Sequence, residues 1–189
     1  ISCSDQEIST FKKLFKYLLT SDQEKSLNEI LIDLKSGHPM MRLLQGDVGS
    51  GKTTVAIISA LASLKCGYQV AFMCPTETLA LQHFSTINEI LQPLNFKVIL
   101  LLGSHTAKEK KIIINQLKAN EIDLIIGTHS LFQESVEFNK LGLAIIDEQH
   151  KFGVEQRIKL KKKGVGVHCL IMTATPIPRS LSLTQYGDL

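Results

Sequence analysis

The chain has 189 residues, of which 44% are hydrophobic and 21% charged, a balance typical of a globular domain and not of a disordered segment. This length suits one domain with a full hydrophobic core, and a formal net charge of +3 permits a nucleic-acid partner without indicating one. Apolar runs stay below the roughly 18 residues of a transmembrane helix, and the N-terminus lacks a signal-peptide pattern. The scattered cysteines form no C-x-x-C pair, which favours a reducing cytoplasm over a zinc site or disulfide framework.

Short apolar runs alternate with helix-like segments along the chain. After a peripheral amphipathic lead-in, residues 1–19, the first helix of the domain is expected near 23–35, opened by capping-box patterns at 20–24. Further helices are expected near 52–64, 78–91, 106–118 and 154–162. The continuous apolar runs predict parallel strands covered on both faces: 40–44, 69–74, 97–102, 123–126, 143–146 and 167–172. This alternation indicates an α/β fold with a doubly wound, mostly parallel sheet, whose ligands sit at the carboxyl ends of the strands.

The strongest motif is GDVGSGKT at residues 46–53, which matches G-x-x-x-x-G-K-[ST] between an apolar strand and a helix. Its glycines permit close backbone approach to a phosphate, aided by the positive end of the following helix. Lys52 would supply a cation for the phosphates, and Thr53 a hydroxyl for Mg²⁺. The residues expected to bind the nucleotide here are Gly46, Asp47, Val48, Gly49, Ser50, Gly51, Lys52, Thr53 and Thr54.

Four polar residues end the apolar run LGLAIIDEQH at 141–150. A nucleotide bound with Mg²⁺ needs a nearby carboxylate, and an aspartate at the end of a parallel strand is the usual supplier. Asp147 is therefore the expected metal carboxylate, and Glu148 the residue that orients or deprotonates the attacking water. Two solvated acids in a loop are the alternative.

Other P-loop classes fit poorly, because the chain lacks an N-K-x-D and an L-S-G-G-Q motif. DEQH at 147–150 together with TAT at 173–175 resembles the superfamily-two helicases and translocases. The blocks LLQGDVGSGKTTVA, PTETLALQH, IIGTHSLFQESVEF, IIDEQHKFGVEQR and MTATPIPRSLSLTQYGDL are similar, in order, to those of the RecG-like family of bacterial branched-DNA helicases. The transcription-repair coupling factors are the nearest alternative.

The resemblance implies a RecA-like fold, a catalytic ATP site and roles for further residues. Gln23 would read the adenine edge, and Tyr17 would stack on the base. His150 would couple the nucleotide site to the segment Thr173, Ala174 and Thr175.

Three loops at carboxyl ends of strands carry small or polar residues whose backbone N–H groups suit contacts to DNA phosphates. The resemblance implies that these loops line the nucleic-acid track, although ordinary turn chemistry explains each one singly. The residues concerned are Pro75, Thr76, Gly103, Ser104, Gly127, Thr128 and His129. Lys161 to Lys163 are interpreted as a solvated helix end more readily than as a DNA patch.

Superfamily-two motors bind ATP between two RecA-like lobes, and the second lobe supplies arginines to the phosphates. The RecG-like family also carries a wedge domain that splits DNA junctions. Residues 20–189 would be the first lobe only, with the second lobe and the wedge domain absent, so we expect weak nucleotide binding and poor turnover. The expected partners are branched DNA, namely forks and Holliday junctions, in a monomeric protein away from membranes. A nucleotide-binding module without motor activity and an RNA helicase remain the alternatives.

Overall fold

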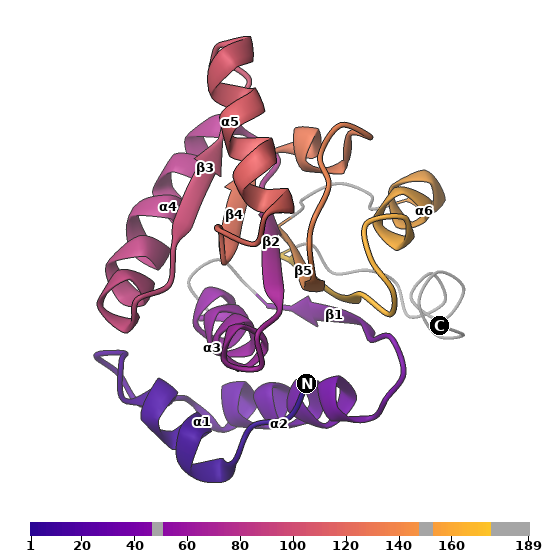
Figure 1. Cartoon of the computed structure of the whole chain (residues 1–189). Coiled ribbons are helices and arrows are strands. Elements are labelled where there is room, and N and C mark those ends of the chain that lie inside the picture. The colour runs from indigo at the N-terminus through magenta and orange to yellow at the C-terminus, as the bar shows by residue number, and fades with distance from the viewer. Residues whose placement is uncertain (47–50, 148–152, 175–189) are drawn as a thin grey trace.

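The computed structural model of the chain describes residues 1–46, 51–147 and 153–174 (Figure 1). Its described strands form one sheet, in which every pairing is parallel. They are β1 (Met41–Gln45), β2 (Gln69–Met73), β3 (Val98–Leu101), β4 (Leu124–Gly127), β5 (Leu141–Asp147) and β6 (His168–Thr173). The strand order is β1-β6-β5-β2-β4-β3. The predicted α/β class with a parallel sheet is confirmed.

Helices cover both faces of this sheet. They are α1 (Asp5–Lys12), α2 (Ser21–Lys35), α3 (Lys52–Lys65), α4 (Glu77–Leu91), α5 (Ala107–Lys118) and α6 (Val154–Lys161), with short 3₁₀ turns η1 (Gln92–Leu94) and η2 (His129–Phe132). Helices α1 to α4 pack into one hydrophobic cluster with one face of the sheet, and α5, η2 and α6 pack into a second cluster on the opposite face.

Neighbouring residues of β2 show why the strands read as continuous apolar runs. Val70 and Phe72 belong to the first cluster, whereas Ala71 and Met73 belong to the second. Because side chains alternate between the faces of a sheet, a strand covered on both sides is apolar at nearly every position. All five residues of β2 are buried.

The segment before residue 20 contains helix α1, which runs below α3 in Figure 1. Ser4 and Glu7 form a capping box at its start. Ile8 and Phe11 are buried in the same cluster as α2 and α3, so the amphipathic lead-in packs on the domain. Within the three described ranges, no helix is long and apolar enough to cross a membrane.

Candidate functional site

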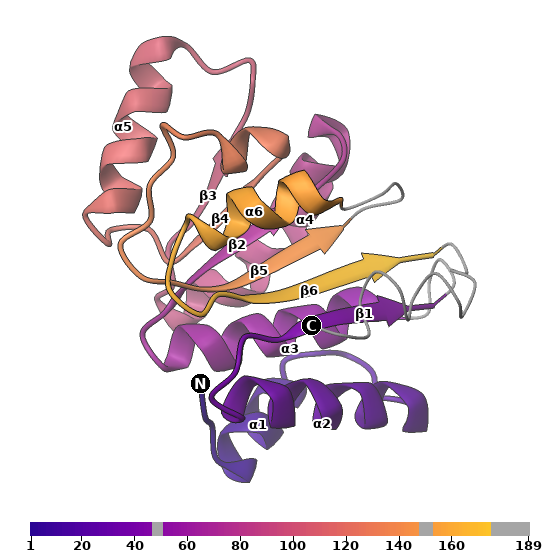
Figure 2. The same ribbon diagram turned by 90° about the vertical axis from the view of Figure 1, so that its right-hand side faces the viewer.

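The carboxyl ends of all six strands lie along one edge of the sheet. Figure 2 shows the arrowheads of β1, β6 and β5 pointing the same way. The register aligns Gln45 with Thr173, and Met172 with Asp147. Asp147 therefore lies two strand spacings, about 10 Å, from the end of β1. The turn that follows β1 and the carboxylate of Asp147, the last residue of β5, share one end of the sheet.

The phosphate-binding motif begins at the end of β1 and continues into the start of α3. Gly46 donates its N–H to the carbonyl of Thr173 at 3.2 Å. At the other end of the motif, Gly51 has a φ of +82°, a left-handed conformation that favours glycine, and α3 begins at Lys52. The Lys52 ammonium donates to the carbonyl of Gly46, so the lysine reaches back across the turn. Asp47, Val48, Gly49 and Ser50 lie outside the described residues.

Thr53 and Thr54 are half-buried in the first turn of α3. A helix N-terminus concentrates positive partial charge, which favours a phosphate there. Among the described residues, the cation of Lys52, the Thr53 hydroxyl and the Asp147 carboxylate make a donor set that suits a triphosphate with Mg²⁺.

Gln23, predicted to read adenine, lies directly over the end of this motif. Its Oε1 accepts the N–H of Thr20 at 2.9 Å in the capping box of α2. A Cβ on Gly51 would overlap the Gln23 amide nitrogen and lie 3.1 Å from its Cδ. The structure therefore brings Gln23 beside the phosphate turn. Tyr17, in the segment between α1 and α2, is 84% exposed, which leaves its ring accessible.

Asp147, the predicted metal carboxylate, is held by a residue that the sequence did not indicate. His83 Nε2 donates to Asp147 Oδ2 at 2.7 Å, and the side chains are 16% and 26% exposed. The imidazole also packs against Phe72, with ring centroids 4.9 Å apart. The predicted nucleotide residues lie at the ends of β1, β6 and β5, which we call the nucleotide half of the edge. His83 belongs to α4, so this helix reaches the nucleotide half.

Cys74 completes a small cluster with this pair. The ligand atoms of Cys74, His83 and Asp147 all lie within 4.8 Å of one another. Burial, and secondly the charge of Asp147, raise the pKa of the Cys74 thiol to about 12. The thiol is therefore protonated at neutral pH.

The three loops predicted to contact DNA lie next to one another on the other half of the edge. Cys74 donates its N–H to the carbonyl of Gly127 at 2.8 Å, and the N–H of Gly103 donates to Glu77 Oε1 at 2.5 Å. Thr76 caps α4 by accepting the N–H of Leu79 at 3.2 Å.

The remaining predicted DNA residues belong to the same loops. Thr128 precedes η2, and His129 is its first residue. Pro75 precedes Thr76, and Ser104 follows Gly103 on the surface. The DNA roles of these loops stay predictions.

The coupling segment lies between the two nucleotide elements. Thr173 ends β6, and its carbonyl accepts the N–H of Gly46. Ala174 follows it, half-buried. Glu148, His150 and Thr175 lie outside the described residues, so their roles stay predictions.

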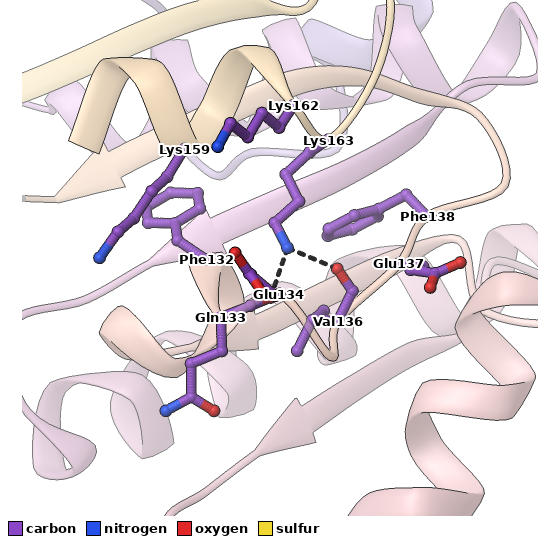
Figure 3. Close-up of a pocket in the computed structure, with 9 residues that line it drawn as sticks. All are labelled: Phe132, Gln133, Glu134, Val136, Glu137, Phe138, Lys159, Lys162 and Lys163. Atoms are coloured by element: carbon purple, nitrogen blue, oxygen red, sulfur yellow. Dashed lines mark hydrogen bonds between the residues drawn. The ribbon is translucent and has the colours of Figure 1, made fainter. Parts of the chain in front are cut away.

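The lysine run at the end of α6 does not form a simple basic patch. The Lys163 ammonium donates to the carbonyls of Gln133 and, at 2.6 Å, Val136, which ties α6 to the segment after η2 (Figure 3). Burial lowers the pKa of Lys163. A pocket of about 660 Å³ lies here, on the face of the sheet covered by α6. Its charge is mixed, since Glu134 and Glu137 line it with three lysines.

Sequence reasoning missed two residues of the edge, Cys74 and His83, whereas Glu77 belongs with Pro75 and Thr76 to a loop that was predicted to contact DNA phosphates. Two signals pointed to His83: it ends the block PTETLALQH at residues 75–83, and it lies seven residues after Thr76, two helical turns along the same face of α4. Neither signal identifies Asp147 as its partner, because the adjacency of β2 and β5 arises from the strand order.

The family model for DEAD/DEAH box helicases matches residues 20–183. The chain belongs to the DEAD/DEAH box helicase family. Within that family it is similar to proteins named ATP-dependent DNA helicase RecG, with 55% identity over 90% of the chain for Borreliella burgdorferi and 51% over the whole chain for Streptococcus pneumoniae. The chain spans 25% and 28% of these relatives, about a quarter of their length.

Solved helicase structures agree with this assignment. The chain superposes on the structure of RecG bound to a three-way DNA junction with a TM-score of 0.84 and 46% identity, over 98% of this chain and 25% of that one. A hypothetical ATP-dependent RNA helicase from Sulfolobus tokodaii gives 0.66 at 19% identity, over 98% of this chain and 56% of that one, and shows the shared fold alone. The predicted helicase resemblance is confirmed at the level of the family and fold.

Proposed function

We propose that residues 20–189 are the first motor lobe of a DNA helicase or translocase that couples ATP hydrolysis to the remodelling of forks and Holliday junctions in recombination and repair. Residues 1–19 lead into this lobe. The proposed complete protein is a cytoplasmic monomer with a second RecA-like lobe and a wedge domain. The relatives named RecG, and the RecG structure bound to a three-way DNA junction, support this choice of substrate.

One observation carries the proposal: Gly46, Lys52, Thr53 and Asp147, from the predicted ATP site, lie on one half of a sheet edge, and the loops after β2, β4 and β3, predicted to contact DNA, lie on the other half. Asp147 stands at the boundary between them, since β5 pairs with β6 on the nucleotide side and with β2 on the DNA side. A motor needs such adjacency, because hydrolysis must be sensed where the DNA is held. A nucleotide-binding module without motor activity has no use for turns that contact DNA phosphates after β2, β4 and β3.

In this proposal each residue of the nucleotide half contacts a different part of ATP. The Gln23 amide reads the adenine edge and Tyr17 stacks on the ring. The backbone of residues 46–53 holds the phosphates, and Lys52 supplies a compact positive charge to them. Thr53 and Asp147 hold Mg²⁺, which supplies neutralisation of charge on the phosphate oxygens.

The remaining residues act on water and on the coupling of the two halves. Glu148 accepts a proton from, or orients, the attacking water. His150 connects the acids to Thr173, Ala174 and Thr175, and the first of these ends strand β6, which pairs with β1. Pro75, Thr76, Gly103, Ser104, Gly127, Thr128 and His129 hold the DNA backbone without reading its sequence.

The test is the ATPase rate of the full-length protein that contains this chain, measured with forked DNA, a Holliday junction, linear duplex and no DNA. We expect branched DNA to stimulate hydrolysis most. If linear duplex stimulated hydrolysis as much as branched DNA does, a translocase similar to the transcription-repair coupling factors would be favoured. A rate unaffected by any DNA would remove the motor function and leave a nucleotide-binding module.

A further inference from the structure

Helix α4 connects the two halves of the site. Its first residue, Glu77, bonds the loop after β3, and its N-cap, Thr76, belongs to the loop after β2. Seven residues later, about 10 Å along the same face, His83 bonds Asp147. One rigid element therefore touches two loops proposed to hold DNA and the carboxylate proposed to hold Mg²⁺.

The His83 side chain is fixed in a way that a surface histidine is not. The imidazole of His83 packs against the ring of Phe72, which is fully buried in β2. Only 16% of the His83 side chain is exposed. A carboxylate only accepts hydrogen bonds, so Nε2 must be the donor in the 2.7 Å contact with Oδ2. This contact holds one oxygen of Asp147 and fixes the direction in which its other oxygen, Oδ1, points.

We infer that His83 is a positioning residue that orients Asp147 toward Mg²⁺ and transmits DNA contact at the start of α4 to the nucleotide site. This inference rests on the proposed function. A phosphate held by the loop at Thr76 acts on the N-terminus of α4, and α4 carries His83. Hydrogen-bond partners of metal ligands typically change metal affinity by 10- to 100-fold, so the orientation of Asp147 has measurable consequences.

A transition-metal site formed by Cys74, His83 and Asp147 fits the geometry less well. His83 Nε2 and Asp147 Oδ2 are 2.7 Å apart and joined by a hydrogen bond, so an ion could bind both atoms only by displacing that hydrogen bond.

Two substitutions separate the donor of His83 from its ring. His83→Phe keeps a ring against Phe72 but has no donor, whereas His83→Gln loses the ring and keeps an N–H donor at a similar reach. The experiment measures ATP hydrolysis by the full-length protein as a function of free Mg²⁺, with and without forked DNA. Thermal unfolding of each variant is measured alongside.

For His83→Phe we expect the Mg²⁺ concentration at half-maximal rate to rise about tenfold and the stimulation by forked DNA to fall. His83→Gln should stay close to the wild type in both readouts. If His83→Phe does not fold, His83→Leu also lacks the donor and takes its place.

A role in packing alone predicts the opposite ranking, with His83→Gln less stable and His83→Phe normal. That result, or equal behaviour of the two variants, overturns the inference. A wild-type protein that DNA does not stimulate would instead count against the proposed function. The Mg²⁺ dependence would still decide the role of His83.

Discussion

Replacing Gly51 with alanine tests whether Gln23 and the phosphate turn are joined as the structure describes. Gly51 and Gly37 both have a φ of +82°, a conformation that costs an alanine about 1 kcal/mol. At Gly37 a Cβ meets nothing within 4 Å, whereas at Gly51 it overlaps the amide of Gln23. Gly37→Ala is therefore a matched control for the backbone cost.

The extra cost at Gly51 comes from displacing Gln23. That side chain accepts the Thr20 N–H at 2.9 Å, a cap interaction whose loss costs about 1 kcal/mol. We expect Gly51→Ala to lower the free energy of unfolding by about 2 kcal/mol and Gly37→Ala by about 1 kcal/mol. In a Gln23→Ala background, Gly51→Ala should lower the free energy of unfolding only by the cost of the left-handed backbone conformation, about 1 kcal/mol.

The assay is urea unfolding of the four variants and the wild type, followed by far-ultraviolet circular dichroism with a common slope. Equal losses for Gly51→Ala and Gly37→Ala would refute the reasoning, as would an unchanged cost of Gly51→Ala in the Gln23→Ala background. Because Gln23 is also proposed to read adenine, Gly51→Ala should weaken ATP binding more than Gly37→Ala does.

Three further predictions concern single side chains. Lys52→Ala should weaken binding of a fluorescent ATP analogue by roughly 10- to 100-fold, with an unchanged circular dichroism spectrum. The control Lys65→Ala, in the last turn of the same helix, should bind the analogue with normal affinity. An unchanged affinity of Lys52→Ala would contradict the proposed contact of Lys52 with the phosphates. Gln69 is buried and its amide makes four hydrogen bonds to backbone groups, so Gln69→Ala should cost about 3 kcal/mol in urea unfolding, against almost nothing for the exposed Gln82→Ala. A cost below that of an ordinary surface substitution would refute this. Burial lowers the pKa of His168, whose Nδ1 accepts a backbone N–H at 2.9 Å. The unfolded chain then binds the proton more readily, so the contribution of His168 to the free energy of unfolding should be fully present above about pH 6.5 and be lost as the pH falls below that value. His168→Asn should remove this part of the dependence of the free energy of unfolding on pH. A slope unchanged in His168→Asn would contradict this cause.

The strands were predictable because both faces of the sheet are covered. In a strand such as β2, every residue after Gln69 is then apolar, and the boundaries of the strand in the structure lie within one residue of the predicted 69–74. β5 begins at Leu141, two residues before the predicted 143–146, because Gly142 interrupts the apolar run. For the segment of α1 the sequence predicts only an amphipathic lead-in, since its eight residues carry too few apolar positions to define a helical period.

The candidate site was predictable where a local motif carries the chemistry. Gly46, Lys52 and Thr53 follow from one contiguous pattern, and Asp147 from the end of a strand. The contact of His83 with Asp147 was not predictable from the sequence, because 64 residues separate them and only the pairing of β2 with β5 brings them together. The position of Gln23 over Gly51 likewise depends on how α2 packs against α3.

The central claim is that the turn at 46–53 and the carboxylate of Asp147 hold one metal-bound triphosphate. The most direct measurement is a crystal structure of the full-length protein with a non-hydrolysable ATP analogue and Mn²⁺, whose anomalous signal locates the ion. We expect the ion beside the β- and γ-phosphates, bonded to the Thr53 hydroxyl and to the Asp147 carboxylate directly or through one water. An ion at the phosphates that Asp147 reaches neither directly nor through a water would contradict it.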